Sequence, residues 1–339
     1  MKKTLNLFLL IFLTFTIIGC GNKTNQTTED TIKEPEIKDE IIVEPVKYYS
    51  PFTGEEVSED DSKKIAFMTI VENSYDARPQ SGVIYADVVY ETLAEGGIPR
   101  FMLLFQKNDT DIIGPVRSAR PYFDVLSKEY NLAFAHCGGS DEAIEKINNE
   151  GLMSLNEFAY TNTYWRDNTR YAPHNLYTSS TNVRDLIKEK NYSTQSNIKF
   201  DFDTEYWNDA SFAPATDVDI KLSSTYDTNY QWNNGKYEKY MDGEIAKDRE
   251  TKNTFTTTNI IIQITDISSI DTYGHLFIEQ IGKGNGYFIS NGKMVPITWS
   301  KSTETSQTMI YDLGGNEVPF NTGNTWWEIV DNSAEININ

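Results

Sequence analysis

Beyond residue 48, the first half of the chain alternates short apolar runs with helix-like segments. Four runs have the continuous or alternating apolar pattern of buried or half-buried strands, and these are residues 65–71, 86–93, 100–106 and 132–136. Residues 119–130, between the last two runs, place Phe123, Leu126 and Tyr130 at helical spacing. Because strands that alternate with helices favour layered packing, we expect an α/β domain over residues 48–195.

Two more helices are indicated in this half by their end signals. Ser140 precedes Asp141 and Glu142. A serine hydroxyl can cap a helix start, and acidic residues favour its positive end. A further helical segment over residues 182–190 is expected to close the domain.

Past Tyr192 the pattern changes to short β-rich runs separated by Asn, Asp, Ser and Thr. The runs cover residues 256–264, 275–281, 286–289, 294–299, 308–311 and 326–330. The tetrapeptides at 290–293 and 313–316 are typical of hairpin turns because Asn-Gly and Gly-Gly tolerate positive φ. We therefore expect a smaller, mainly antiparallel β domain over residues 213–331, which makes the fold class α+β or α/β overall.

The N-terminus has the pattern of an exported lipoprotein. Lys2 and Lys3 precede an uncharged, apolar run over residues 5–18, which ends in Gly19-Cys20. This pattern predicts a signal peptide over residues 1–19, and Ile-Ile-Gly-Cys resembles a bacterial lipobox. A diacylglyceryl group on Cys20 would then anchor the protein to the extracytoplasmic face of the cell membrane. Residues 20–47 are expected to form the lipidated cysteine and a flexible tether because they carry few apolar side chains.

Composition removes several function classes. The formal charge is −20, with pI ≈ 4.6, and it becomes about −22 once Lys2 and Lys3 leave with the signal. Nucleic acid is therefore excluded as an expected partner, because it is bound through clustered cations. With Cys20 lipidated, only Cys137 remains, so we expect no intramolecular disulfide. The three histidines lack metal-ligand spacing, and we expect neither a metal nor a cofactor.

Candidate chemistry concentrates where strands are expected to end. Residues 113–123 run from a strand end into a helix and carry Arg117, Ser118 and Arg120, and we expect the two arginines to share one helical face. Backbone amides at such junctions favour anionic ligands. The residues 136–140 repeat the strand, glycine turn and helix start. Their candidate ligand-binding members are His136, Gly138, Gly139 and Ser140.

A third loop adds Arg170, His174, Asn175 and Tyr177 to the candidate site. Together these positions predict one anion-binding site, because the planar guanidinium fork binds phosphate or carboxylate through parallel hydrogen bonds. The structural alternative is that Arg117 and Arg120 form salt bridges, and the acidic residues considered as partners are Asp87, Glu91 and Glu95. A thiol–imidazole pair of Cys137 and His136 is geometrically poor because adjacent strand residues point to opposite faces.

The chain resembles the YerB-like lipoprotein family, a family of mainly Gram-positive bacteria that has a domain of unknown function and a C-terminal companion domain. The resemblance covers nearly the whole exported part. Its motifs lie at residues 77–82, 86–91, 114–123, 136–140, 173–177, 259–263 and 297–299. The resemblance implies the two-domain organisation, but it does not indicate an enzymatic activity.

A more distant similarity links the chain to LytR-CpsA-Psr enzymes, which transfer polyprenyl-linked glycans to peptidoglycan and hold the pyrophosphate with arginines. It depends on an acidic strand, Ile-Pro-Arg at 98–100 and a glycine pair after a strand. The Arg-Asp pair that follows the proline in those enzymes is replaced here by Arg100-Phe101. This departure puts their catalytic apparatus in doubt for this chain.

These observations lead to three hypotheses. The first is a membrane-anchored lipoprotein, non-catalytic or weakly catalytic, that binds an anionic cell-wall ligand such as a lipid-linked phosphate or glycan through Arg117, Arg120 and Arg170. The second is a glycan-phosphate transferase or hydrolase in which Glu91 and His136 act as base and acid and which acts on peptidoglycan or a polyprenyl-phosphate glycan. The third is a structural lipoprotein that binds a protein partner.

Overall fold

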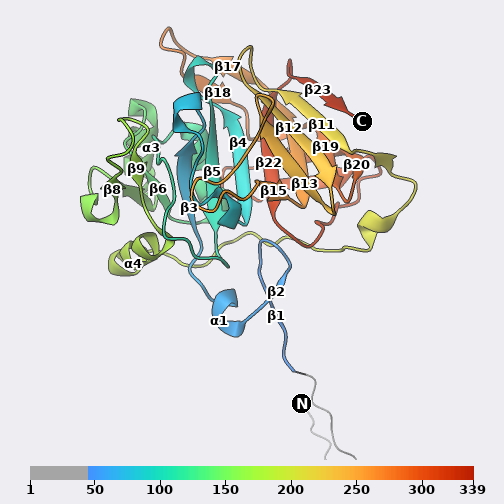
Figure 1. The fold of residues 1–339 in the computed structure, drawn as a ribbon, viewed down its shortest axis with the longest axis horizontal. Coiled ribbons are helices and arrows are strands. Elements are labelled where there is room, and N and C mark those ends of the chain that lie inside the picture. Colours follow the sequence, from blue (N-terminus) through green and yellow to red (C-terminus); the bar gives the residue numbers. More distant parts are fainter. Residues whose placement is uncertain (1–44) are drawn as a thin grey trace, which may run out of the picture. The chain divides into compact units, whose positions relative to one another are not determined.

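A mixed eleven-stranded sheet forms the core of the computed structural model, which describes residues 45–339 (Figure 1). The predicted signal peptide, Cys20 and nearly all of the tether lie outside these residues. The strand order is β10-β20-β19-β16-β22-β4-β5-β3-β6-β7, with β21 beside β20. The first half of the sequence supplies β3 (Phe67–Glu72), β4 (Val88–Leu93), β5 (Pro99–Phe105), β6 (Phe134–His136) and β7 (Ser154–Asn156). The second half supplies β10 (Ala213–Pro214), β16 (Asn259–Thr265), β19 (Gly282–Ser290), β20 (Lys293–Lys301), β21 (Met309–Asp312) and β22 (Thr325–Asp331).

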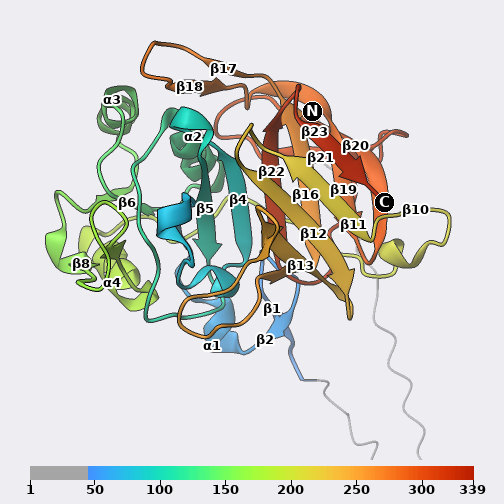
Figure 2. The ribbon, with the colours of Figure 1, turned by 45° about the horizontal axis from the view of Figure 1, so that its top comes forward.

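A second, six-stranded antiparallel sheet packs against the second-half strands of the large sheet. Figure 2 shows its strands lying across those of the large sheet. They are β11 (Asp217–Lys221), β12 (Asp227–Asn233), β13 (Lys236–Met241), β14 (Glu244–Ile245), β15 (Thr256–Thr257) and β23 (Glu335–Ile338).

Short paired strands and helices complete the described part. The strand pairs are β1 (Tyr48–Tyr49) with β2 (Glu56–Val57), β8 (Trp165–Arg166) with β9 (Leu176–Tyr177), and β17 (Ile267–Ser269) with β18 (Leu276–Ile278). The α-helices are α1 (Glu59–Ser62), α2 (Pro121–Tyr130), α3 (Asp141–Glu150) and α4 (Ser180–Lys190). The 3-10 helices are Tyr75–Ala77, Val83–Tyr85, Glu95–Gly97, Thr161–Thr163 and Tyr206–Asn208. Among the helices of residues 45–339, none has the length and apolarity that a membrane span requires.

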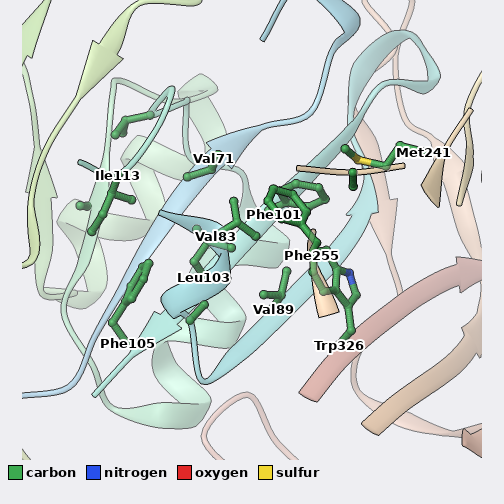
Figure 3. Close-up of a cluster of buried hydrophobic side chains, with 14 of the residues drawn as sticks. Val71, Val83, Val89, Phe101, Leu103, Phe105, Ile113, Met241, Phe255 and Trp326 are labelled. Atoms are coloured by element: carbon green, nitrogen blue, oxygen red, sulfur yellow. The ribbon is translucent and has the colours of Figure 1, made fainter. Parts of the chain in front are cut away.

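The central strands are buried on both faces of the large sheet. Along β5, Phe101, Leu103 and Phe105 join one apolar cluster, whereas Met102 and Leu104 join the other. Helices α2 and α3 pack into the second cluster, and α4 and the six-stranded sheet pack into the first. Figure 3 shows part of the first cluster, where side chains of β5 approach those of the second half of the chain. Burial on two faces explains why residues 101–105 are continuously apolar.

A buried cation joins the two halves of the chain. Strand β22 lies parallel to β4 and places Glu328 opposite Glu91. The Nζ atom of Lys239, from β13 in the other sheet, lies 2.7 Å from Glu91 Oε2 and 3.3 Å from Glu328 Oε1. All three side chains are at most 1% exposed. Lys239 also lies 4.4 Å from the centroid of the Trp326 ring, so the ammonium contacts both carboxylates and an aromatic face.

The fold class is α+β, and it is confirmed. Helices α2, α3 and α4 correspond to the three predicted helices, and Ser140 caps α3 by accepting a hydrogen bond from the amide of Ala143. The Asn291-Gly292 turn joins β19 to β20 with positive φ at both residues. The strands over residues 217–245 and β23 are missing from the sequence prediction. The predicted division into two domains, one ending at residue 195 and the other beginning at residue 213, stays a prediction. The large sheet contains strands from both sides of this division.

Replacing Lys239 with alanine should strongly destabilise the protein. The substitution leaves Glu91 and Glu328 buried as an unpaired carboxylate pair, and breaking such a buried pair costs about 3–5 kcal/mol. Chemical denaturation should show this loss in the free energy of unfolding. As a matched control, Lys188→Ala removes an ion pair with Asp185 from a side chain that is 62% exposed, and it should cost less than about 1 kcal/mol. Equal losses for the two variants would contradict the assigned role of Lys239.

Candidate functional site

The carboxyl ends of three parallel strands meet at one edge of the large sheet. Strands β3, β6 and β7 are parallel neighbours and end at Glu72, His136 and Asn156. An extended segment over residues 113–119 crosses this edge. It is held there by bridges from Val116 to Val71 and from Ala119 to Gly139. Strand ends of this kind are where α/β sheets place ligands.

Arg117 lies in this segment and is held beside a carboxylate without being hydrogen-bonded to it. Its Nε atom is 3.4 Å from Glu72 Oε1, and its side chain is 28% exposed. That Nε atom is buried and has no hydrogen-bond partner in the described part of the chain. The terminal guanidinium nitrogens likewise make no hydrogen bond to residues 45–339. Arg117 is therefore charge-compensated at its buried Nε atom, and only its terminal nitrogens remain available as donors.

His174 reaches the same carboxylate from the loop that follows β8. Its Nδ1 atom lies 2.9 Å from Glu72 Oε2, and its Nε2 atom lies 3.9 Å from Asp76 Oδ2. The structure thus brings together two predicted site residues, Arg117 and His174, through Glu72. Sequence reasoning missed Glu72, and the signal that could have found it is an acidic residue that ends the otherwise uncharged strand 67–72.

Arg120 is placed differently from the sequence prediction. It precedes the first turn of α2, because Pro121 begins the helix, so the prediction that Arg117 and Arg120 share one helical face is wrong. Arg120 pairs with Glu95, and its Nη2 donates to Glu95 Oε2 at 2.7 Å. The structural alternative is confirmed for this pair. Arg117 pairs with Glu72, however, and with none of the carboxylates that the sequence suggested.

A third arginine, which sequence reasoning did not select, joins Arg117 and Arg120. Arg100 donates to the carbonyl of Ser118 at 3.1 Å and pairs with Glu95 at 3.1 Å. Burial, together with the charges of Arg120 and Arg117, lowers the pKa of Arg100 to about 10. The charges of Arg117 and Arg120 thus both act on Arg100, and the carboxylates that pair with the three arginines are Glu95 and Glu72.

Arg170 binds backbone and keeps the loop after β3 in place. Its guanidinium donates to the carbonyls of Ala77, Arg78 and Pro79 at 2.7, 2.9 and 3.1 Å. These bonds occupy the donors that the sequence analysis assigned to a ligand. Arg170 is therefore a positioning residue for the loop that carries Asp76 and Tyr75.

Asn175 and Tyr177 are also occupied by protein contacts. The side-chain oxygen of Asn175 accepts from Arg166 at 3.1 Å. Tyr177 is buried, and its hydroxyl accepts from Arg249 at 3.1 Å. Both residues hold the loop that presents His174.

The glycine turn at 138–140 is shaped by the fold. Gly138 has φ +61°, and a Cβ atom there would approach Phe158 to 2.9 Å, so a side chain would be strained. The amide of Gly138 donates to Asn156 Oδ1 at 2.9 Å. Gly139 packs against Ile144, and the hydroxyl of Ser140 is used as the cap of α3.

The two proposed catalytic residues are both buried. His136 Nδ1 lies 2.7 Å from the carbonyl oxygen of Gly138, and Nε2 lies 2.7 Å from Ser154 Oγ. Burial lowers the pKa of His136 to about 4, so the imidazole is neutral near pH 7. Glu91 is committed to Lys239 and to Asn73. Both ring nitrogens and both carboxylate oxygens are therefore already engaged within the protein.

Cys137 is half-buried, and its Sγ atom lies 3.5 Å from Glu157 Oε2. Burial and the Glu157 charge raise the pKa of the Cys137 thiol, which disfavours the nucleophilic thiolate. Within residues 45–339, no group of three or more His, Cys, Asp or Glu side chains is arranged to hold a metal ion.

Comparisons with known proteins agree on one family. Residues 52–193 match the family described as "Protein of unknown function (DUF3048) N-terminal domain", and residues 217–327 match its C-terminal domain. The chain is 29% identical over 335 residues to "Putative lipoprotein YerB" of Bacillus subtilis (strain 168), which covers 97% of this chain and 96% of that protein. A crystal structure of the YerB protein from Bacillus subtilis superposes with a TM-score of 0.78 at 28% identity, over 86% of this chain and 100% of the solved chain. The resemblance to YerB-like lipoproteins is confirmed.

Replacing His136 with glutamine should flatten the acid side of the stability profile. Because burial lowers the pKa of His136 from 6.5 to about 4, the unfolded chain binds the proton more readily between these pH values. Folding stability therefore falls as pH decreases from 6.5 to 4. This one group should contribute about 3 kcal/mol to that fall.

The measurement is urea denaturation of wild type and His136→Gln at pH 7 and at pH 4. The variant is expected to be less stable than wild type at pH 7, because glutamine does not reproduce both ring contacts. Its free energy of unfolding should nevertheless fall less than that of wild type between pH 7 and pH 4. The comparison is between the two pH-dependent losses, so carboxylates common to both proteins cancel. Identical losses would show that His136 does not stay neutral in the folded protein.

Proposed function

The chain belongs to the DUF3048 family, and we propose from this membership and from the geometry of Arg117 that it is a lipid-anchored envelope lipoprotein that binds an anionic ligand. Its Bacillus subtilis relative is described as a lipoprotein. The sequence Gly19-Cys20 after an apolar segment supports the same anchoring here. The proposal assigns the anion to the group formed by Arg117, Ser118 and His174.

One observation carries the ligand assignment. Arg117 is compensated in charge by Glu72 at 3.4 Å, yet its guanidinium makes no hydrogen bond within residues 45–339. The buried Nε atom faces Glu72, whereas the two terminal nitrogens are not among the buried unpartnered atoms and are open to a ligand. A phosphate or carboxylate group would accept two parallel hydrogen bonds from these terminal nitrogens.

The surrounding charges favour an anion over a cation. Arg100 and Arg120 share the single carboxylate of Glu95, and Arg117 shares Glu72 with His174. Three arginines therefore gather at this edge of the sheet, where the carboxylates are Glu72, Glu95 and Asp76, although the whole chain is acidic. Phosphate on a lipid or a glycan is the ligand class that suits both the guanidinium and the anchored position. The transferase alternative has no comparable support, because Glu91 and His136 are engaged within the protein.

Arg117→Gln should weaken phosphate binding, whereas Arg120→Gln should not. Both substitutions remove one positive charge, but only Arg117 has donors that the protein leaves open, and Glu95 keeps Arg100 as its partner in the second variant. Isothermal titration of the full chain in detergent with inorganic phosphate and with undecaprenyl phosphate should show at least about a tenfold weaker affinity for Arg117→Gln, equivalent to about 1.4 kcal/mol. Equal affinities for both variants, or no saturable binding by wild type, would refute the assignment.

Cys20→Ser should release the protein from membranes. The substitution removes the sulfur that would carry diacylglycerol, and the buried acyl chains supply about 0.8 kcal/mol per methylene to attachment. When expressing cells are fractionated, the wild-type protein should be found with the membranes and the Cys20→Ser variant in the soluble fraction. Mass spectrometry of the wild-type N-terminus should find a lipid-modified Cys20. An intact Met1 on the membrane-bound protein would contradict cleavage and lipidation.

A further inference from the structure

Tyr75 is both rigidly held and half exposed. It lies in the loop after β3, and its hydroxyl donates to the carbonyl of Thr225 at 2.6 Å. Its ring stacks on Tyr226 with centroids 4.7 Å apart and an interplanar angle of 22°. The guanidinium carbon of Arg78 lies 5.1 Å from the Tyr75 ring centroid. The residue is nevertheless 53% exposed, so these contacts present a preorganised aromatic surface to solvent.

Two hollows flank Tyr75, and both also use Asp242 as a wall. The first has a volume of about 410 Å³, with an apolar floor formed by Pro79, Met241, Ile245 and Ala246. The second has a volume of about 390 Å³ and is polar. Both volumes lie in the range of small-molecule sites, about 300–1,000 Å³.

The rim of the first hollow offers acceptors and donors that the protein does not use. Glu244 and Lys247 line it and are exposed. Neither side chain makes a hydrogen bond or ion pair within residues 45–339. Asp242, in contrast, is engaged by Arg78 and by the amide of Asp227 at 2.7 Å. The rim therefore combines one fixed carboxylate with a free acceptor and a free donor.

We infer that Tyr75 is the stacking platform of a saccharide-binding site, in which the flanking hollows take adjoining sugar units. A sugar ring has a face of C–H groups, which packs on the electron-rich face of an aromatic ring. Its hydroxyl groups both donate and accept, which matches the free carboxylate of Glu244 and the free ammonium of Lys247. An N-acetyl methyl group would fit the apolar floor beside Met241 and Ile245.

This inference rests on the proposed function, because it extends the same ligand along the same loop. The loop after β3 follows Glu72, which pairs with Arg117 and His174. It then carries Tyr75, which lines the two hollows, Asp76, which lies near His174, and Arg78. A glycan that carries a phosphate could contact the platform with its sugar and Arg117 with its anionic end. The ligand class is then a phosphorylated or lipid-linked glycan, and a peptide is the competing occupant.

The test is calorimetric titration of the full chain in detergent with the uncharged tetramer of N-acetylglucosamine. Tyr75→Ala should weaken binding by at least about tenfold, whereas Tyr75→Phe should stay within about threefold of wild type because the ring is retained. Tyr273→Ala, which removes a tyrosine that is 84% exposed elsewhere, should bind as wild type does. Unchanged thermal unfolding would verify that each variant is folded.

Two further variants make the outcomes decisive. Glu244→Gln and Lys247→Ala leave the platform intact and should each weaken binding several-fold. Arg117→Gln should leave binding of the uncharged tetramer unchanged, and Tyr75→Ala should leave inorganic phosphate binding unchanged, so the saccharide and anion assignments fail independently. Absence of saturable tetramer binding, equal affinities for Tyr75→Ala and Tyr273→Ala, or displacement of the tetramer by a peptidoglycan stem peptide would overturn the inference.

Discussion

The buried ammonium of Lys239 is the interaction on which the rest of the structure depends. Glu91 and Glu328 face each other across neighbouring parallel strands, and burial together with the Glu91 charge raises the pKa of Glu328, whereas the ammonium of Lys239 lowers it. Lys239 comes from the other sheet, so one side chain ties the two sheets and both halves of the chain together. This compensation is made at the point where β22 lies beside β4, which is where the large sheet joins the two halves of the chain.

The same arrangement sets the position of the candidate ligand surface. Asn73 donates to Glu91 at 2.8 Å and accepts from Arg78 at 2.9 Å. The loop after β3 is therefore tied to the buried triad at one end and to the second sheet through Asp242. The exposed side chains of this loop are therefore held in place through contacts with the buried cluster of Glu91, Glu328 and Lys239. Within the described residues this cluster is hydrogen-bonded except at Glu328 Oε2, and hydrogen bonds are strong in a low-dielectric interior.

Much of the fold could be predicted from local signals, and the site could be predicted only in part. Ser140 and the Asn291-Gly292 turn act through neighbouring backbone atoms, so sequence alone identifies them. Arg117 could be selected by type, but its setting depends on bridges to β3 and to the glycine turn after β6 that no local pattern encodes. Glu72 could have been selected as the acidic end of an uncharged strand, but its pairing with Arg117 and His174 joins distant segments. The strands at 217–245 were missed because one face is polar, which hides their alternating apolar residues among Asp and Asn.

The place of β22 in the sheet has a consequence for assembly. It lies between β16 and β4, yet it comes from residues 325–331, close to the end of the chain. When the polypeptide is delivered from its N-terminus, by a ribosome or through a translocation pore, β4 and β16 must wait with open hydrogen-bonding edges until this segment emerges. Open edges of that kind invite misassembly with other chains. The large sheet is therefore completed only after residues 325–331 emerge, and protection of these two edges by a chaperone would matter most until then.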